Sequence, residues 1–111
     1  MRISAISSTN YCVANQQSCK KQNVNFKVGN VLSSDTFYDD SNSGMDWAKM
    51  GVLGVEMEAA ALYCNASRLC KNALAILTVS DSFIYPEENT TAQEREQSFN
   101  SMMEIALEIA E

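Results

Sequence analysis

The segment that most constrains the fold is residues 73–79, in which six of the seven residues are apolar (Ala-Leu-Ala-Ile-Leu-Thr-Val). An unbroken apolar run of this length is typical of a strand that is covered on both faces, as in a parallel sheet flanked by helices. Residues 25–32 and 52–57 also have strand character, the second as a buried strand. Segments with helical character follow these strands. The sequence therefore predicts a three-layer α/β fold with a parallel or mixed central sheet.

The segments with helical character are residues 10–21, 43–50, 58–71 and 91–110. The first has only a thin apolar face, whereas Gly51 gives the second a clear end. Thr91 and Glu94 have the spacing of a capping box, so the last segment predicts a single helix that begins there. Two polar loops separate the predicted elements, and these are residues 33–42 and 80–89.

Composition excludes several classes of function. A chain of 111 residues supports one small core, and its net charge of -6 argues against a surface that binds nucleic acid. The sequence has no histidine and its four cysteines lack a CxxC spacing, so zinc and haem lose their usual ligands. No apolar run approaches the roughly 20 residues of a membrane span, and the N-terminus lacks the order of a signal peptide. We therefore expect a cytoplasmic protein that uses no metal.

Two carboxylates interrupt the apolar stretch of residues 52–62, and these are Glu56 and Glu58. Burying an unpaired carboxylate costs several kcal/mol, so acids at a strand-to-helix junction usually have a group to bind. Ligands of α/β sheets collect beyond the carboxyl ends of the strands. The loops that follow the three predicted strands should therefore open on one rim, and they carry residues 33–38, 56–58 and 80–82.

Arg95 is the fourth candidate for this rim. On a continuous helix it would share one stripe with the apolar residues Phe99, Met102, Ala106 and Ile109. It would also lie in the first turn, where the helix dipole disfavours a cation. An arginine placed against both rules predicts an anionic partner, and Asp81 is the natural candidate.

Four motifs, in order, resemble those of the bacterial-type purine nucleoside phosphorylases, within the nucleoside phosphorylase superfamily. They are VGNVLSSDTFY at residues 28–38, GVEMEAA at 54–60, LTVSD at 77–81 and ENTTAQER at 88–95. The resemblance covers residues 24–111 and corresponds to the C-terminal half of that family's domain. Residues 1–23 match the family poorly and form a separate, partly helical N-terminal segment in this interpretation.

The resemblance implies a reaction and a role for each site residue. A purine nucleoside and phosphate would give the free base and ribose 1-phosphate, with phosphate as co-substrate, no cofactor, and self-association into a homo-oligomer. The implied catalytic residues are Asp81, which would protonate N7 of the base, and Arg95, which would assist it. The implied substrate-binding residues are Phe37, stacked on the purine, Glu56, Met57 and Glu58 at the ribose, and Ser80 beside Asp81.

The chemistry of the reaction agrees with a carboxylic acid at this position. Breaking the glycosidic bond leaves negative charge on the departing base, so a proton delivered to N7 makes the base a better leaving group. An ordinary aspartic acid is almost fully ionised at pH 7, so an aspartate in this role must be desolvated. A cation next to the acid would oppose its protonation before the reaction. We therefore expect Arg95 to contact Asp81 as the surrounding loop closes over a substrate.

Two departures from the family pattern leave an alternative open. Ser82 follows Asp81 where the family commonly has histidine. The glycine-rich loop and the arginines that hold phosphate in the family have no counterpart in this sequence. The alternative is therefore a non-catalytic fragment that retains a nucleoside-binding or oligomerisation surface. Taken singly, Glu58 could equally be a helix N-terminal acid that the dipole favours.

Overall fold

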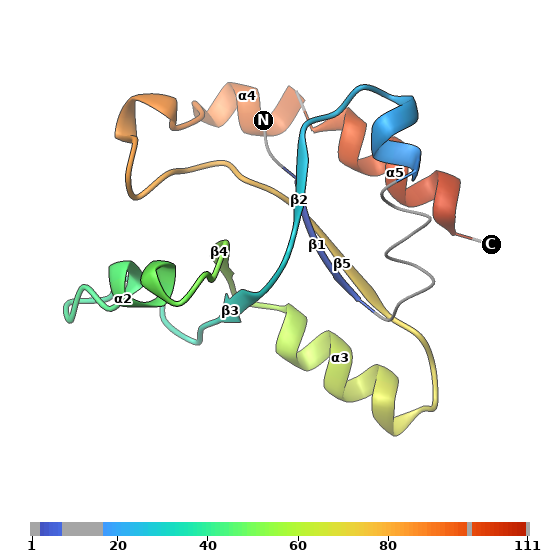
Figure 1. Ribbon diagram of the computed structural model, residues 1–111, viewed down its shortest axis with the longest axis horizontal. Helices are drawn as coiled ribbons and strands as arrows, with labels where there is room; N and C mark the ends of the chain where they lie inside the picture. Colours follow the sequence, from blue (N-terminus) through green and yellow to red (C-terminus); the bar gives the residue numbers. More distant parts are fainter. Residues whose placement is uncertain (1–2, 8–16, 98, 111) are drawn as a thin grey trace.

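A mixed three-stranded sheet forms the centre of the computed structural model, which describes residues 3–7, 17–97 and 99–110 (Figure 1). Its strands are β1 (Ile3–Ser7), β2 (Phe26–Val28) and β5 (Leu74–Thr78), in the order β2-β1-β5. β1 runs parallel to β2 and antiparallel to β5. The predicted α/β fold is confirmed, and the sheet is mixed. The sequence did not predict β1, although this strand joins the other two.

A second, smaller sheet corrects the predicted strand at residues 25–32. That segment forms β2 and β3 (Val31–Ser33), and β3 leaves the central sheet to pair in parallel with β4 (Gly54–Glu56). The chain changes sheet at Gly29, where an added Cβ atom would lie 2.7 Å from Cδ1 of Leu53. The N–H of Leu53 donates to the carbonyl oxygen of Asn30 at 2.8 Å. A side chain at position 29 would therefore have to displace Leu53 from this crossing.

β4 is also shorter and less buried than the strand predicted at residues 52–57. It comprises three residues, and the side chain of its central residue, Val55, is 41% exposed. Burial is deeper in β5, where Ala75 is buried and the other residues are half-buried. The apolar run that carried the fold prediction is thus the most buried strand of those whose side chains the structure describes.

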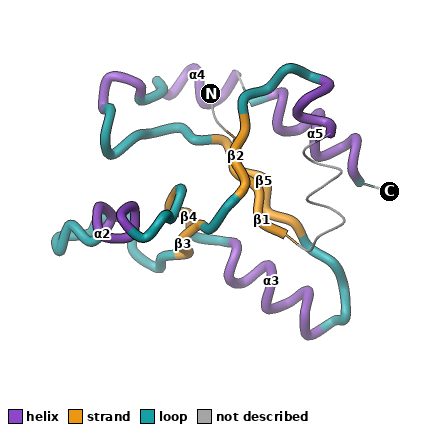
Figure 2. The backbone as a smooth tube through the Cα atoms, viewed as in Figure 1, coloured by secondary structure: helices purple, strands orange, loops and turns teal. Residues whose placement is uncertain are grey.

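Helices flank the central sheet on two sides (Figure 2). The helices of the chain are α2 (Gly44–Lys49), α3 (Ala59–Arg68), the 3-10 helix η1 (Pro86–Glu88), α4 (Ala92–Gln97) and α5 (Asn100–Ile109), and those that flank this sheet are α3, α4 and α5. In this view α4 and α5 lie above the sheet and α3 lies below it. Residues 17–21 are helical as well, whereas residues 10–16 of the helix predicted at 10–21 lie outside the described residues. Among the described residues, no helix is long and apolar enough to cross a membrane.

The buried core lies between α5 and the central sheet. Ile105 and Cys19 are fully buried, and the residues packed against them are Val24, Phe26, Ile76 and Met102. Across the same interface, the Ser18 hydroxyl donates a hydrogen bond to the carboxylate of Glu108. These contacts join residues 17–21 to α5. On the other side, the N–H of Ala75 donates to the Tyr63 hydroxyl at 2.9 Å, which connects α3 to β5.

The last helix predicted at residues 91–110 is two helices in the structure. α4 ends at Gln97, Phe99 is the N-cap residue of α5, and residue 98 is not described. The stripe predicted from Arg95 to Ile109 therefore does not run along one helix. Arg95 lies in the last turn of α4, where the helix dipole favours a cation. The expectation that the dipole opposes Arg95 is thus wrong.

Two helices end in the same hydrogen-bonding motif, the Schellman motif. At the end of α2, Gly51 has φ +82° and its N–H donates to Ala48, while Val52 donates to Trp47. Gly51 thus ends this helix as predicted. α3 ends at Arg68, before the predicted residue 71, because Cys70 adopts φ +53°. The two Schellman hydrogen bonds of α3 run from Cys70 to Ser67 and from Lys71 to Ala66.

Candidate functional site

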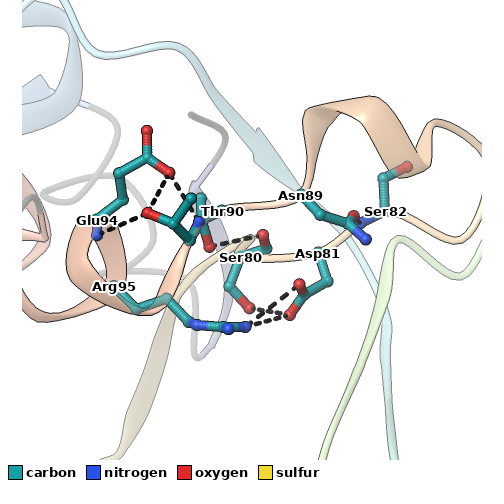
Figure 3. Close-up of polar contacts among 8 residues, drawn as sticks. Ser80, Asp81, Ser82, Asn89, Thr90, Glu94 and Arg95 are labelled. Atoms are coloured by element: carbon teal, nitrogen blue, oxygen red, sulfur yellow. Dashed lines mark hydrogen bonds and ion pairs between the residues drawn. The ribbon is translucent and has the colours of Figure 1, made fainter.

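Asp81 and Arg95 form an ion pair just beyond the end of β5 (Figure 3). Nη1 of Arg95 lies 3.3 Å from each carboxylate oxygen of Asp81, and the Ser80 hydroxyl donates to Oδ2 of Asp81 at 2.8 Å. The Arg95 side chain is 46% exposed and the Asp81 side chain 42% exposed. The predicted partnership between the two residues is therefore present, on the surface and open to water.

The loop of residues 80–90 that carries Asp81 is closed at its base by two sets of hydrogen bonds. The N–H and the hydroxyl of Thr90 both donate to the carbonyl oxygen of Ser80, at 2.8 and 2.9 Å. The N–H of Ser82 donates to Oδ1 of Asn89 at 2.7 Å. Figure 3 shows the contact between Thr90 and Ser80 and places Asn89 beside Ser82. These hydrogen bonds fix the backbone from which Asp81 projects.

Ser82 has its own role in this loop. Its hydroxyl oxygen accepts hydrogen bonds from the N–H groups of Ile84 and Tyr85, at 3.3 and 2.9 Å. Further along the loop, the Phe83 ring lies near Gly44 of α2, where an added Cβ atom would meet it at 3.7 Å. The position where the resembling family commonly has histidine is thus occupied by a residue that shapes the turn.

The predicted capping box at the start of α4 is confirmed. The N–H and the hydroxyl of Thr91 donate to Oε2 of Glu94, and the N–H of Glu94 donates to the Thr91 hydroxyl at 3.2 Å. The amide of Thr91 and then its hydroxyl hold the pKa of Glu94 below its usual range. The cap fixes the first turn of the helix that presents Arg95.

A second group of polar residues, which we call the Glu56 cluster, comprises Ser33, Glu56, Glu58 and the first amides of α3. Oε2 of Glu56 accepts hydrogen bonds from the N–H of Glu58, at 2.7 Å, and from that of Ala59, while Oε1 accepts one from the Ser33 hydroxyl. Burial by itself would raise the pKa of Glu56, but Ser33 and the two amides outweigh it and lower the pKa. The carboxylate of Glu56 is therefore engaged by the protein itself.

Glu58 differs from Glu56 in being exposed. It is the N-cap residue of α3, and its Oε2 accepts a hydrogen bond from the N–H of Met57 at 3.2 Å. The Met57 side chain is also exposed. Both side chains are thus accessible to a ligand at the end of β4, where the resemblance implies that the ribose binds.

Phe37 projects from the loop that follows β3. Its side chain is 77% exposed and packs edge-on against Tyr38, with ring centroids 5.0 Å apart and an interplanar angle of 80°. One face of an exposed ring is free to stack on a planar group, which is the arrangement that base recognition by aromatic residues uses.

The loops that the sequence placed on one rim follow strands of two different sheets. β3 and β4 pair with each other, and the N–H of Ser34 donates to the carbonyl oxygen of Glu56 at 2.8 Å, so the loops after these two strands share an edge. β5 belongs to the other sheet. Within residues 17–97, no hydrogen bond joins the Glu56 cluster to Asp81 or Arg95. The three loops therefore follow strands of two sheets, and the prediction that they leave one sheet is corrected.

Three residues with structural roles at the site were missed by the sequence analysis. Ser33 holds Glu56, and Asn89 with Thr90 closes the loop around Asp81. All three are small polar residues inside the motifs. The motifs identified the segments, but nothing in the sequence indicated the individual contacts. The described arginines are Arg68 and Arg95, and each lies in the last turn of its helix. The described residues thus offer no cluster of arginines for phosphate.

Comparison with known proteins identifies the family. The sequence profile described as "Phosphorylase superfamily" matches residues 8–111. Similar proteins include purine nucleoside phosphorylases of the DeoD type from Clostridium novyi, 56% identical over 93 residues, and from Thermoanaerobacter sp., 58% identical over 86 residues. A third, from Geobacillus sp., is 51% identical over 90 residues. These alignments cover 83%, 77% and 81% of this chain and 40%, 36% and 38% of the respective relatives.

The chain thus spans well under half the length of the curated relatives that it matches. The resemblance inferred from the four motifs is confirmed, because the relatives carry the name of the family that the motifs indicated. With a profile match over nearly all of its length, the chain belongs to the phosphorylase superfamily.

Proposed function

We propose that this chain acts in purine nucleoside phosphorolysis and carries the residues that bind the nucleoside and protonate the base. In the proposed reaction an oxygen of phosphate bonds to C1′ of the ribose, and the bond from C1′ to N9 breaks. The bonding electrons leave with the purine, whose N7 takes a proton from Asp81. The products are the free base and ribose 1-phosphate. We also propose that the protein works in the cytoplasm as a homo-oligomer, as its resemblance implies.

The pairing of Asp81 with Arg95 is the observation that carries this proposal. A general acid needs a group that stabilises the carboxylate formed once the proton has left, and the shared Nη1 contact at 3.3 Å supplies one. Glu58 would accept hydrogen bonds from the 2′ and 3′ hydroxyls of the ribose, with Met57 packed on the sugar and Glu56 behind them. Phe37 would stack on the base. Ser80, which already donates to Asp81, would hold the acid in place.

The openness of the site favours a second candidate function. At 42% exposure the Asp81 side chain is in contact with water, so a purine bound there would need an additional surface to exclude water from the acid. A chain that remains in this open state would bind a nucleoside through Glu58 and Phe37 without turnover, or would serve as an oligomerisation surface.

Replacement of the acid by its amide separates the two candidates. We expect Asp81→Asn to lower the rate of base release from inosine by about 100-fold or more, because general acid catalysis contributes on that scale. The matched control is Asp46→Asn, which removes an exposed carboxylate paired with Lys49 at 2.8 Å away from the site. Equal rates in Asp81→Asn and the parent chain would contradict the assigned role. Nucleoside binding without release by the parent chain would favour the second candidate.

A further inference from the structure

The hydrogen bonds around Ser33 point to a function for a residue outside the proposed reacting groups. Its hydroxyl donates to Oε1 of Glu56 and accepts a hydrogen bond from the N–H of Ala60 at 2.9 Å. One side chain on β3 therefore contacts both the acid at the end of β4 and the first turn of α3. The hydroxyl uses its donor on one partner and an acceptor position on the other.

Glu56 continues this connection to the residue proposed to hold the sugar. Oε2 of Glu56 accepts hydrogen bonds from the N–H groups of Glu58 and Ala59. The backbone of Glu58 is thus fixed through Glu56, and Glu56 is fixed through Ser33. The backbone bond from Ser34 to Glu56, at 2.8 Å, ties the same two strands together.

We infer that Ser33 is a positioning residue, which acts through Glu56 to hold the carboxylate of Glu58 where it can accept both ribose hydroxyls. Glu56 then has a structural task, capping α3, while Glu58 faces the ligand. The inference rests on the proposed function in one respect, since it takes Glu58 as the group that binds the sugar. A carboxylate that must accept two hydrogen bonds at once depends on a fixed orientation. Loss of the hydrogen bonds from Ser33 through Glu56 therefore weakens both bonds to the ribose together.

The physical reason for the arrangement is the short length of the elements involved. β3 and β4 have three residues each, and Val55, the central residue of β4, is exposed. Strands of this length bury little apolar surface and bring few ladder hydrogen bonds. Side-chain hydrogen bonds must therefore supply the rigidity that longer strands obtain from packing.

The test compares Ser33→Thr with Ser33→Val in the full 111-residue chain. The two side chains have nearly the same shape, both suit a strand, and only threonine keeps the hydroxyl. The first measurement is the ratio of dissociation constants for 2′,3′-dideoxyinosine and inosine, since only inosine offers the hydroxyls. The second is hydrogen exchange of the amides of Glu58, Ala59 and Ala60. It measures, without any ligand, how firmly Glu56 and Ser33 hold these amides. Ser34→Ala is the control, because the Ser34 hydroxyl bonds within its own loop, to the carbonyl oxygen of Thr36 at 2.9 Å.

We expect the parent chain, Ser33→Thr and Ser34→Ala to prefer inosine and to exchange these amides slowly. Ser33→Val should reduce the preference about tenfold and speed the exchange by a similar factor, as for the loss of a hydrogen bond to a charged group. A Ser33→Val chain that keeps both the preference and the slow exchange would overturn the inference while leaving the proposed function intact. A parent chain without preference for inosine would instead contradict the assignment of Glu58 to the sugar, and with it the purpose given to Ser33.

Discussion

Nη1 of Arg95 is shared between the two carboxylate oxygens of Asp81, at 3.3 Å from each. This geometry differs from the parallel, two-nitrogen fork that arginine forms with carboxylates in strong ion pairs. With both side chains more than 40% exposed, the pair contributes little to folding, under about 1 kcal/mol. The proposed function assigns the pair to chemistry rather than to stability.

Replacing Arg95 should affect turnover far more than folding. We expect Arg95→Ala to lower the rate of base release by at least about tenfold, because the carboxylate formed after proton transfer loses its partner. The free energy of unfolding should change by less than about 1 kcal/mol. Urea unfolding and a base-release assay measure the two effects. Lys49→Ala is the control, since it removes the cation of another exposed pair. A large loss of stability with unchanged turnover would show that Arg95 is structural.

Cys70 should be replaceable by glycine with a gain in stability. It occupies the left-handed position after α3, at φ +53°, which glycine fills at the end of α2. We expect Cys70→Gly to raise the free energy of unfolding by up to about 1 kcal/mol, because glycine adopts positive φ without steric cost. Cys64→Gly, within α3, should lower it by about 1 kcal/mol. Thermal or urea unfolding of the two variants measures both, and destabilisation by Cys70→Gly would count against the Schellman end of this helix.

Glu56 should make the protein more sensitive to acid. Because its pKa is lower in the folded chain than in the unfolded chain, the stabilisation by its carboxylate is complete above the unfolded pKa. That contribution is lost as the pH falls through the folded pKa, so it declines below about pH 4.5. Urea unfolding of the parent chain and of Glu56→Gln should therefore differ most near pH 6 and converge toward pH 3. A difference that grows on acidification would contradict the hydrogen bonds assigned to Glu56.

Asp39 should titrate at unusually low pH. The hydroxyls of Ser41 and Ser43, with lesser contributions from their amides, outweigh desolvation and lower the pKa of Asp39 to about 2. The N–H and the hydroxyl of Ser43 donate to Oδ2 at 2.8 and 2.6 Å. A carboxyl-carbon NMR titration should give this value in the parent chain and a higher pKa in Ser43→Ala. An equal pKa of Asp39 in the parent chain and in Ser43→Ala would mean that the loop before α2 lacks these hydrogen bonds in solution.

The sequence predicted the elements and contacts that depend on neighbouring residues. The capping box of Thr91 with Glu94 and the end of α2 at Gly51 follow from local chemistry, and both are confirmed. The pairing of Asp81 with Arg95 was also predicted, although neither of its two arguments holds, because the stripe from Arg95 to Ile109 is divided between two helices. Arg95 lies in the last turn of a short helix, so the dipole favours the cation there.

The errors concern relationships between segments that are far apart in the sequence. Residues 25–32 have the apolar pattern of one strand, but Gly29 lets the chain pass close to Leu53 and enter a second sheet. β1 contains two serines among its five residues, so its pattern gave little sign of a strand between β2 and β5. The pairing of strands depends on tertiary contacts that no window of sequence contains. For this reason strands of two sheets appeared in the sequence as members of one sheet.

Base release from inosine and adenosine by the purified 111-residue chain, with and without phosphate, tests the proposed reaction itself. Free base and ribose 1-phosphate are both measured, and circular dichroism shows that the chain is folded. We expect base release to require phosphate, to give the two products in equal amounts, and to be about 100-fold slower or more in Asp81→Asn. A folded chain that releases no base, or that releases it equally well without phosphate, would contradict the claim that it carries out purine nucleoside phosphorolysis.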